Sequence, residues 1–114
     1  MLLSRPRVFI RHELPSEVVG VAIAVIADYE RRAREIKRGV LSEHLLSAYR
    51  RYQGIVDSAL ECVEPEARRE LISDIASGRG YNHSMLSTSY YKAGYYSRKR
   101  QVIYSVAKGM GLCE

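Results

Sequence analysis

The sequence has few of the features that mark exported, disulfide-bonded or membrane-spanning proteins. Cys62 and Cys113 are its only cysteines, which predicts two free thiols in a reducing compartment. The longest apolar run, residues 18–27, is about ten residues long, far short of the roughly 20 that cross a bilayer. The N-terminus also lacks the order of basic and apolar residues found in a secretory signal. We therefore expect a cytoplasmic protein without a membrane partner.

The sequence also lacks the residue patterns that most metal and catalytic sites require. Its three histidines are scattered, with no His-Glu-x-x-His motif and no cysteine pair at metal-binding spacing. The glycines at 78–80 and 109–111 are typical of helix ends and not of a phosphate-binding loop. These absences predict no catalytic residues, no metal and no cofactor, so we expect that the protein is not an enzyme.

Acidic residues are almost missing from the last third of the chain. Residues 1–77 hold twelve Lys or Arg and twelve Asp or Glu, whereas residues 78–114 hold six basic residues and one acid, Glu114. The whole net charge of +5 therefore lies in the last third. Charge segregated in this way is expected of a nucleic-acid-binding surface, although a solvated basic helix without a partner would have the same composition.

Helical periodicity dominates the first two thirds of the chain, which at 114 residues is expected to form one domain. Pro15 and Glu17 predict the start of a helix over 16–38, buried nearly all round in its first half and ended by Gly39. Ser42 predicts the cap of a second helix over 43–63. Its apolar seam has a heptad-like spacing: Leu45, Tyr49, Tyr52, Val56, Ala59 and Val63. We expect residues 15–63 to form a long antiparallel helical pair.

The last part of the chain, residues 65–112, has the order of elements of a helix-turn-helix unit. Pro65 predicts a helix that runs to Ser77, and a short turn of helix is expected over 84–87. A longer basic helix then follows, and its start can lie anywhere from Ser87 to Gly94 because 87–89 are good N-cap residues. The predicted fold is therefore all-α: the antiparallel pair followed by a C-terminal helix-turn-helix.

The leading end of the last helix carries the residue types that read duplex DNA. Arg and Lys bind guanine edges or phosphates, Gln pairs with adenine, and Ser and Tyr hydroxyls bind phosphates. On this basis eight residues are predicted to bind DNA: Lys92, Tyr95, Tyr96, Ser97, Arg98, Lys99, Arg100 and Gln101. The tyrosines of the pairs Tyr90-Tyr91 and Tyr95-Tyr96 could also pack in the core, and we expect one of each pair to be buried and the other exposed.

Several stretches together resemble a family of small phage and prophage transcriptional regulators. They are residues 57–65, 70–75, Gly80-Tyr81, 95–104 (Tyr-Tyr-Ser-Arg-Lys-Arg-Gln-Val-Ile-Tyr) and 106–112 (Val-Ala-Lys-Gly-Met-Gly-Leu). The order is similar to that of late-gene activators of the RinA and ArpU types, over roughly residues 55–112. The resemblance implies a helix-turn-helix like that of region 4 of sigma factors, with DNA contact by Tyr95–Arg100 and RNA polymerase as a candidate partner.

The first 63 residues leave two further questions open. Residues 1–14 are expected to form an extended arm, whose three arginines could reach a phosphate backbone. The helical pair could bury the same surface of a second copy in a homodimer. A competing hypothesis makes the chain a helical interaction or assembly protein, such as a small packaging-type subunit or an adaptor, with an incidental basic surface.

Overall fold

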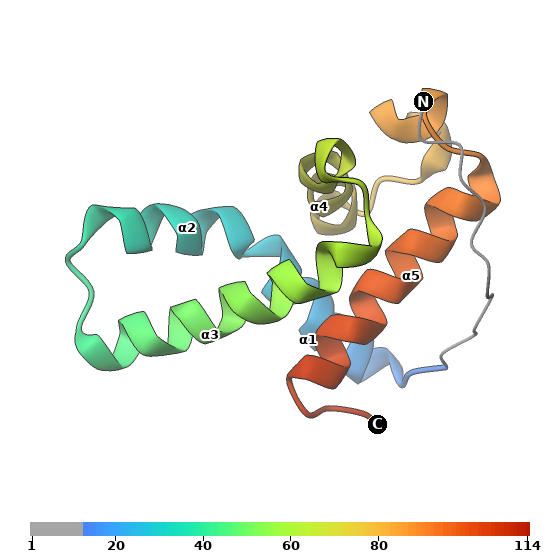
Figure 1. The fold of residues 1–114 in the computed structure, drawn as a ribbon. Coiled ribbons are helices and arrows are strands. Elements are labelled where there is room, and N and C mark those ends of the chain that lie inside the picture. Colours follow the sequence, from blue (N-terminus) through green and yellow to red (C-terminus); the bar gives the residue numbers. More distant parts are fainter. Residues whose placement is uncertain (1–12) are drawn as a thin grey trace.

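Every regular element within residues 13–114, the part of the chain that the computed structural model describes, is a helix (Figure 1). The predicted all-α class is therefore confirmed. The α-helices are α1 Ser16–Ala27, α2 Tyr29–Arg38, α3 Glu43–Ala59, α4 Arg68–Ser77 and α5 Lys92–Gly109. Short 3₁₀ helices lie between them: η1 Leu60–Cys62, η2 Pro65–Ala67, η3 Tyr81–His83 and η4 Met85–Thr88.

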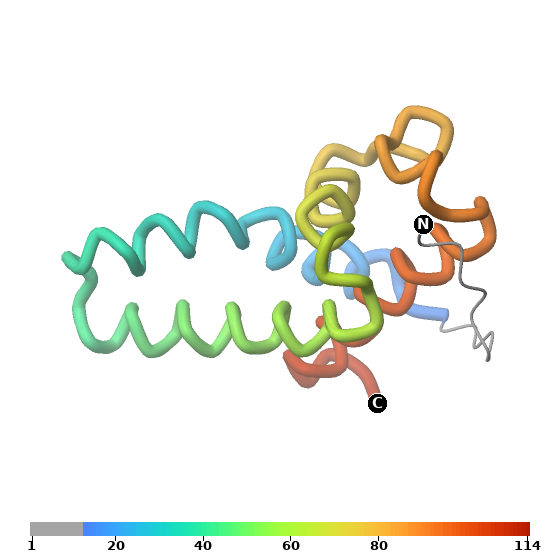
Figure 2. The backbone as a smooth tube through the Cα atoms, turned by 45° about the horizontal axis from the view of Figure 1, so that its top comes forward, coloured from blue at the N-terminus to red at the C-terminus, as the bar shows by residue number. Residues whose placement is uncertain are grey.

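Helix α2 and the part of α3 beside it project from the rest of the molecule, and we call them the arm (Figures 1 and 2). Gly39 ends α2 in the left-handed conformation, with φ 74°, which a glycine adopts without steric cost. The Ser42 hydroxyl accepts a hydrogen bond from the Leu45 amide, so Ser42 caps α3 as predicted. The turn between the two helices is therefore set by local sequence.

The single helix predicted over 16–38 is wrong, because the chain breaks at Asp28 into α1 and α2. The Arg32 side chain is only 3% exposed and donates a hydrogen bond of 2.6 Å to the carbonyl of Val25. Gln53 of α3 accepts from Arg32 at 2.6 Å and donates to the carbonyl of Tyr29 at 3.0 Å. Side chains that bind main-chain carbonyls in this way bend a helix. Arg32 and Gln53 thus fix the direction of the arm.

The core lies where α1, α3, α4 and α5 meet, at the base of the arm (Figure 2). Its fully buried aliphatic side chains come from all four helices: Ile26, Val56, Leu71, Val102 and Val106. The expectation that the first half of 16–38 is buried nearly all round is wrong. In α1 only Ala22 and Ile26 are buried, and Val21 is 44% exposed.

The segment between α4 and α5 contains only short 3₁₀ helices, but it packs firmly against the core. Gly78 ends α4 with φ 74°, and the helical turn expected near 84–87 is the 3₁₀ helix η4. Helix α5 begins at Lys92 after Tyr91, so the serines and threonine at 87–89 do not cap it. Tyr90 and Tyr95 are buried and Tyr91 is 55% exposed, as expected, whereas Tyr96, the other member of its pair, is partly buried against the core and not exposed as expected.

Three other predictions concern the cysteines, membrane spans and the N-terminal residues. Cys62 and Cys113 are free thiols in the structure, as predicted. No helix within residues 13–114 is both long enough and apolar enough to cross a membrane. Of the N-terminal arm expected at 1–14, residues 1–12 lie outside the described part of the chain.

Candidate nucleic-acid interface

Helix α5 packs with one side against α1 and α3 and turns its opposite side outward (Figure 1). Tyr95, Val102 and Val106 lie on the packed side and are fully buried. They recur at the helical spacings of seven and four residues, which places them on one face. The exposed residues of the helix are Lys92, Ala93, Arg100, Lys108 and Gly109, so every fully exposed charge on α5 is a cation.

The first turns of α5 are anchored by a buried carboxylate on α4. Asp74 is 0% exposed and accepts hydrogen bonds from the hydroxyl of Tyr95 at 2.8 Å and from the hydroxyl of Ser84. The Arg79 guanidinium forms an ion pair with the same carboxylate at 3.1 Å. Burial, and then the bond to Asp74, raise the pKa of the Tyr95 phenol, so this hydroxyl stays protonated as a donor. One side chain therefore links α4, the 79–84 segment and α5.

A second cluster ties α5 to the segment before α4. Arg98 donates to both carboxylate oxygens of Glu64, at 3.0 and 3.2 Å, and its guanidinium carbon lies 4.5 Å from the centre of the Tyr90 ring. The Tyr90 hydroxyl donates to the same carboxylate. Burial alone would raise the pKa of Glu64, but the bonds from Tyr90 and Arg98 lower it to about 2. The Arg98 side chain is only 11% exposed, so it is committed to this cluster.

Lys99 and Tyr96 also make contacts inside the protein. The Lys99 ammonium donates to the carbonyl of Arg79 at 2.6 Å and lies 5.2 Å from the centre of the Tyr95 ring. The Tyr96 hydroxyl accepts from the amide of Tyr81 at 3.1 Å. Both residues hold the segment that follows α4 against the side of α5.

The eight residues predicted to bind DNA thus fall into two groups. Those that serve the packing of α5 are Tyr95, Tyr96, Arg98 and Lys99. Those on the outward side are Lys92 and Arg100, which are exposed, and Ser97 and Gln101, which are partly exposed. Gln101 donates to the hydroxyl of Ser105, one turn further along. Lys108 extends the outward side toward the C-terminal end of the helix.

The outward side of α5 carries no negative charge of its own. No Asp or Glu occurs between Gly78 and Cys113, so the nearest acids in sequence are Asp74 and Glu114. Asp74 is buried beneath the helix. The Tyr104 hydroxyl donates to the main-chain oxygen of Glu114 at 2.6 Å, which brings the C-terminus to the last turns of α5. The exposed charges that α5 itself carries are therefore all positive, while Glu13 lines a shallow pocket together with Arg100 and Tyr104.

Comparison of the chain with protein-family models, curated proteins and solved structures gives no match.

Sequence reasoning missed the residues that position α5, above all Asp74 and Glu64. A signal for Asp74 was present, because it lies between Leu71 and Ile75 on the apolar stripe of its helix. An acid on a buried stripe requires hydrogen-bond donors from elsewhere in the fold. Glu64 carries no such signal, because its partner Arg98 is 34 residues away.

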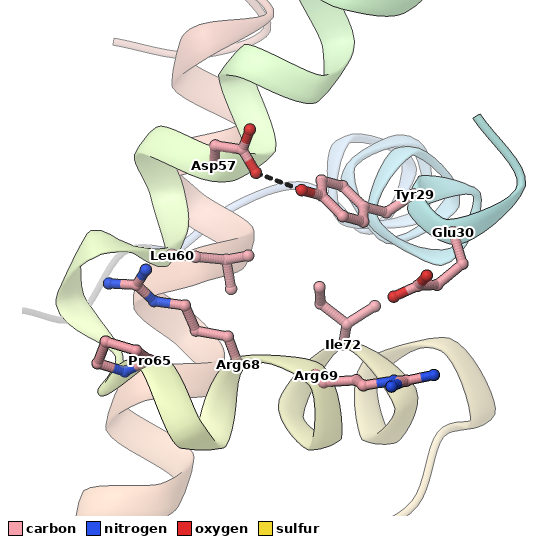
Figure 3. Close-up of a pocket in the computed structure, with 8 residues that line it drawn as sticks. All are labelled: Tyr29, Glu30, Asp57, Leu60, Pro65, Arg68, Arg69 and Ile72. Carbon is pink, nitrogen blue, oxygen red and sulfur yellow. Dashed lines mark hydrogen bonds between the residues drawn. The ribbon is translucent and has the colours of Figure 1, made fainter. Parts of the chain in front are cut away.

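A cavity of about 470 Å³ lies on another side of the molecule, between α2, α3 and α4 (Figure 3). The Tyr29 hydroxyl donates to Asp57 at 2.5 Å across it, and burial together with this bond raises the Tyr29 pKa to about 12. Its other charged lining residues are Glu30, Arg68 and Arg69. Since both signs of charge line this cavity, it does not suit a polyanion.

Proposed function

We propose that the chain is a sequence-specific double-stranded DNA-binding protein, and that it regulates transcription for a phage or prophage. The observation that carries the proposal is the outward side of α5, on which Lys92, Arg100 and Lys108 are exposed and to which the helix contributes no acid. A helix fits the major groove of B-DNA, where cations on its outward side can reach phosphates and base edges. The resemblance of 55–112 to phage regulators supports the same partner.

In this proposal α4, the turn containing η4, and α5 act as a helix-turn-helix unit. Helix α5 is the recognition helix, and Leu86, 5% exposed, is the core anchor of the short middle element. Ser97 and Gln101 are the residues proposed to read bases, and Lys92 and Arg100 those proposed to bind guanine or phosphates. Tyr95, Arg98 and the other packed residues keep the helix at a fixed angle.

The arm is the proposed site of homodimerisation. Tyr49 and Tyr52 are partly exposed along α3, and Leu45 is 39% exposed. A two-fold dimer would present two copies of α5 to two half-sites, spaced by about 34 Å or a multiple of it. One small basic helix provides limited affinity, and a second copy would multiply it.

Selection of bound duplexes from a random pool tests this proposal. We expect enrichment of a defined sequence, arranged as two related half-sites if the dimer forms. Binding of the enriched duplex should weaken steeply as salt is raised, because phosphate contacts release counterions. Failure to retain any duplex at low salt, or retention with no enriched sequence, would show that sequence-specific binding is not the function.

A second function is favoured by the tip of the arm. Val40 is 69% exposed there and Leu45 lies close by in sequence, so two apolar side chains meet solvent at the end of a projecting hairpin. An interaction or assembly protein would use this tip to bind a protein partner. The two functions are distinguished by Val40→Asp, which would abolish capture of a protein partner at the tip without changing the salt dependence of DNA binding.

A further inference from the structure

Helix α2 carries a row of cations along the side opposite its partly buried face, and the first of them, Arg31, reaches back to donate a hydrogen bond to the Tyr49 hydroxyl of α3 at 3.0 Å. Arg31, Arg34 and Arg38 are spaced by three and four residues, so they share one face over roughly 10 Å of helix. Lys37 lies beside them and is exposed. The opposite side of the helix, with Ala33 and Ile36, is partly buried in the arm. The charge count along the sequence did not reveal this surface, because the acids of residues 1–77 equal the basic residues in number.

Within the described residues, two of these four cations have no carboxylate partner. Arg31 pairs with Asp28 at 2.6 Å, and Arg38 pairs with Glu35 at 3.1 Å with 64% of its side chain exposed. No acid in residues 13–114 comes within 4.0 Å of the Arg34 guanidinium or the Lys37 ammonium. The outward face of α2 therefore keeps positive charge that the fold does not neutralise.

The fold gains little from this arrangement. Arg34 stands one turn from both Arg31 and Arg38, and like charges at these spacings destabilise a helix. Lys37 and Arg38 do favour the C-terminal end of the helix dipole, which accounts for those two positions. Arg34 lies in the middle of α2, one turn after Glu30, and this favourable spacing offsets only one of its two like-charged neighbours. The row is thus an electrostatic cost that a polyanion would remove.

We propose that the outward face of α2 is a second surface for the phosphate backbone of duplex DNA, distinct from the outward side of α5. The choice of duplex DNA rests on the proposed function, whereas the surface does not. Duplex DNA carries one negative charge per roughly 1.7 Å, so a 10 Å row of cations meets several phosphates. Three of the four cations are arginines, whose guanidinium groups bind phosphate oxygens in pairs.

The same face suits other polyanions less well. A helix that lies on a lipid surface buries a large apolar face, but the apolar side of α2 already packs in the arm. A protein interface needs an apolar centre from which water is excluded, and the row of cations on α2 contains no apolar side chain. Phosphate-backbone binding needs only exposed cations, and this surface offers them.

Three double variants of equal charge test the inference against the salt dependence of duplex binding. Arg34→Gln with Lys37→Gln removes the cations of α2 that have no acid partner, and Arg100→Gln with Lys108→Gln removes two exposed cations of α5. Arg50→Gln with Arg51→Gln is the matched control on α3, because Arg50 lies on one line of the helix between Glu43 and Asp57. All six side chains are exposed, so each variant should keep the melting temperature of the wild type.

We expect the α2 variant to reduce the slope of log affinity against log salt by roughly 1.8 units, from two lost phosphate contacts. The α3 control should change the slope far less. If the α2 variant only matches the α3 control, the inference fails, and the α5 variant then reports separately on the proposed function. If the α2 variant instead lowers binding to vesicles containing phosphatidylserine while its duplex binding is unchanged, the surface binds lipid and the inference is overturned.

Discussion

Replacement of Asp74 by Asn should weaken the fold more than any other single isosteric change. The carboxylate is 0% exposed and accepts from Tyr95, Ser84 and Arg79. Asn keeps the shape, but it loses the charge and offers one acceptor oxygen in place of two. Hydrogen bonds to a charged group are worth about 1.5–3 kcal/mol each, and an unpaired buried donor costs about 1–3 kcal/mol.

We therefore expect Asp74→Asn to lower the free energy of unfolding by about 3 kcal/mol. For a chain of this length the unfolding entropy is roughly 0.24 kcal/mol/K, so the melting temperature should fall by about 12 °C. Urea unfolding followed by circular dichroism, at pH 7 and constant salt, measures the change directly. An unchanged slope of free energy against urea would show that only stability has altered.

The control is Asp57→Asn, which removes an exposed carboxylate that accepts one hydrogen bond, from Tyr29. This change should cost less than about 1 kcal/mol, as exposed polar pairs do. Tyr95→Phe removes a single donor from the Asp74 cluster and should give an intermediate loss of about 1–2 kcal/mol. If Asp74→Asn costs no more than Asp57→Asn, the buried carboxylate does not anchor α5 and the positioning argument is refuted.

Two further predictions concern the packing of α5 and its ion pair. A Cβ at Gly109 would lie 2.8 Å from Ile55, so Gly109→Ala should lower the free energy of unfolding by about 1 kcal/mol. A Cβ at Gly54 would meet nothing within 4 Å, so Gly54→Ala should raise the free energy of unfolding by about 0.5–1 kcal/mol. Equal effects of the two changes would contradict close packing at Gly109. The pKa of Glu64 is lowered to about 2, against about 4.3 unfolded, so its stabilising effect is complete above pH 4.3 and lost as the pH falls toward 2. Glu64→Gln should therefore destabilise the protein at pH 7 and much less near pH 2, and a cost that is independent of pH would count against the ion pair with Arg98.

Local signals in the sequence predicted much of the fold. The positions of Gly39 and Gly78 marked helix ends, and Ser42 marked a helix start, because these residues act through the adjacent backbone. Apolar spacing predicted helices over 43–63 and 65–77, and the structure has α-helices over 43–59 and 68–77 with the 3₁₀ helices η1 and η2 between them. The break at Asp28 was missed because it depends on Gln53, which is 24 residues from the carbonyl that it binds. Periodicity cannot report a bond across that distance.

The candidate site was harder to predict, for the same reason. A count of basic residues does not show which of them have partners. Arg98 and Lys99 were both predicted to contact DNA. In the structure Arg98 forms an ion pair with Glu64, and Lys99 binds the carbonyl of Arg79. On α2 the charge count failed in the opposite sense, because it missed a cation that is available at the surface. Residues 1–77 have no net charge, yet Arg34 has no acid partner among the described residues. Long-range pairing determines which charges remain available at the surface.

Crosslinking from a single thiol on α5 tests most directly whether its outward side lies on DNA. In a chain with Cys62→Ala and Cys113→Ala, a photoactivated crosslinker is attached at Ser97→Cys, or at Ser47→Cys on the outward side of α3 as the control. Helix α5 in the major groove predicts crosslinks to bases of the selected duplex from position 97 and few from position 47. Equal yields from the two positions, or crosslinks from position 47 alone, would contradict recognition by α5.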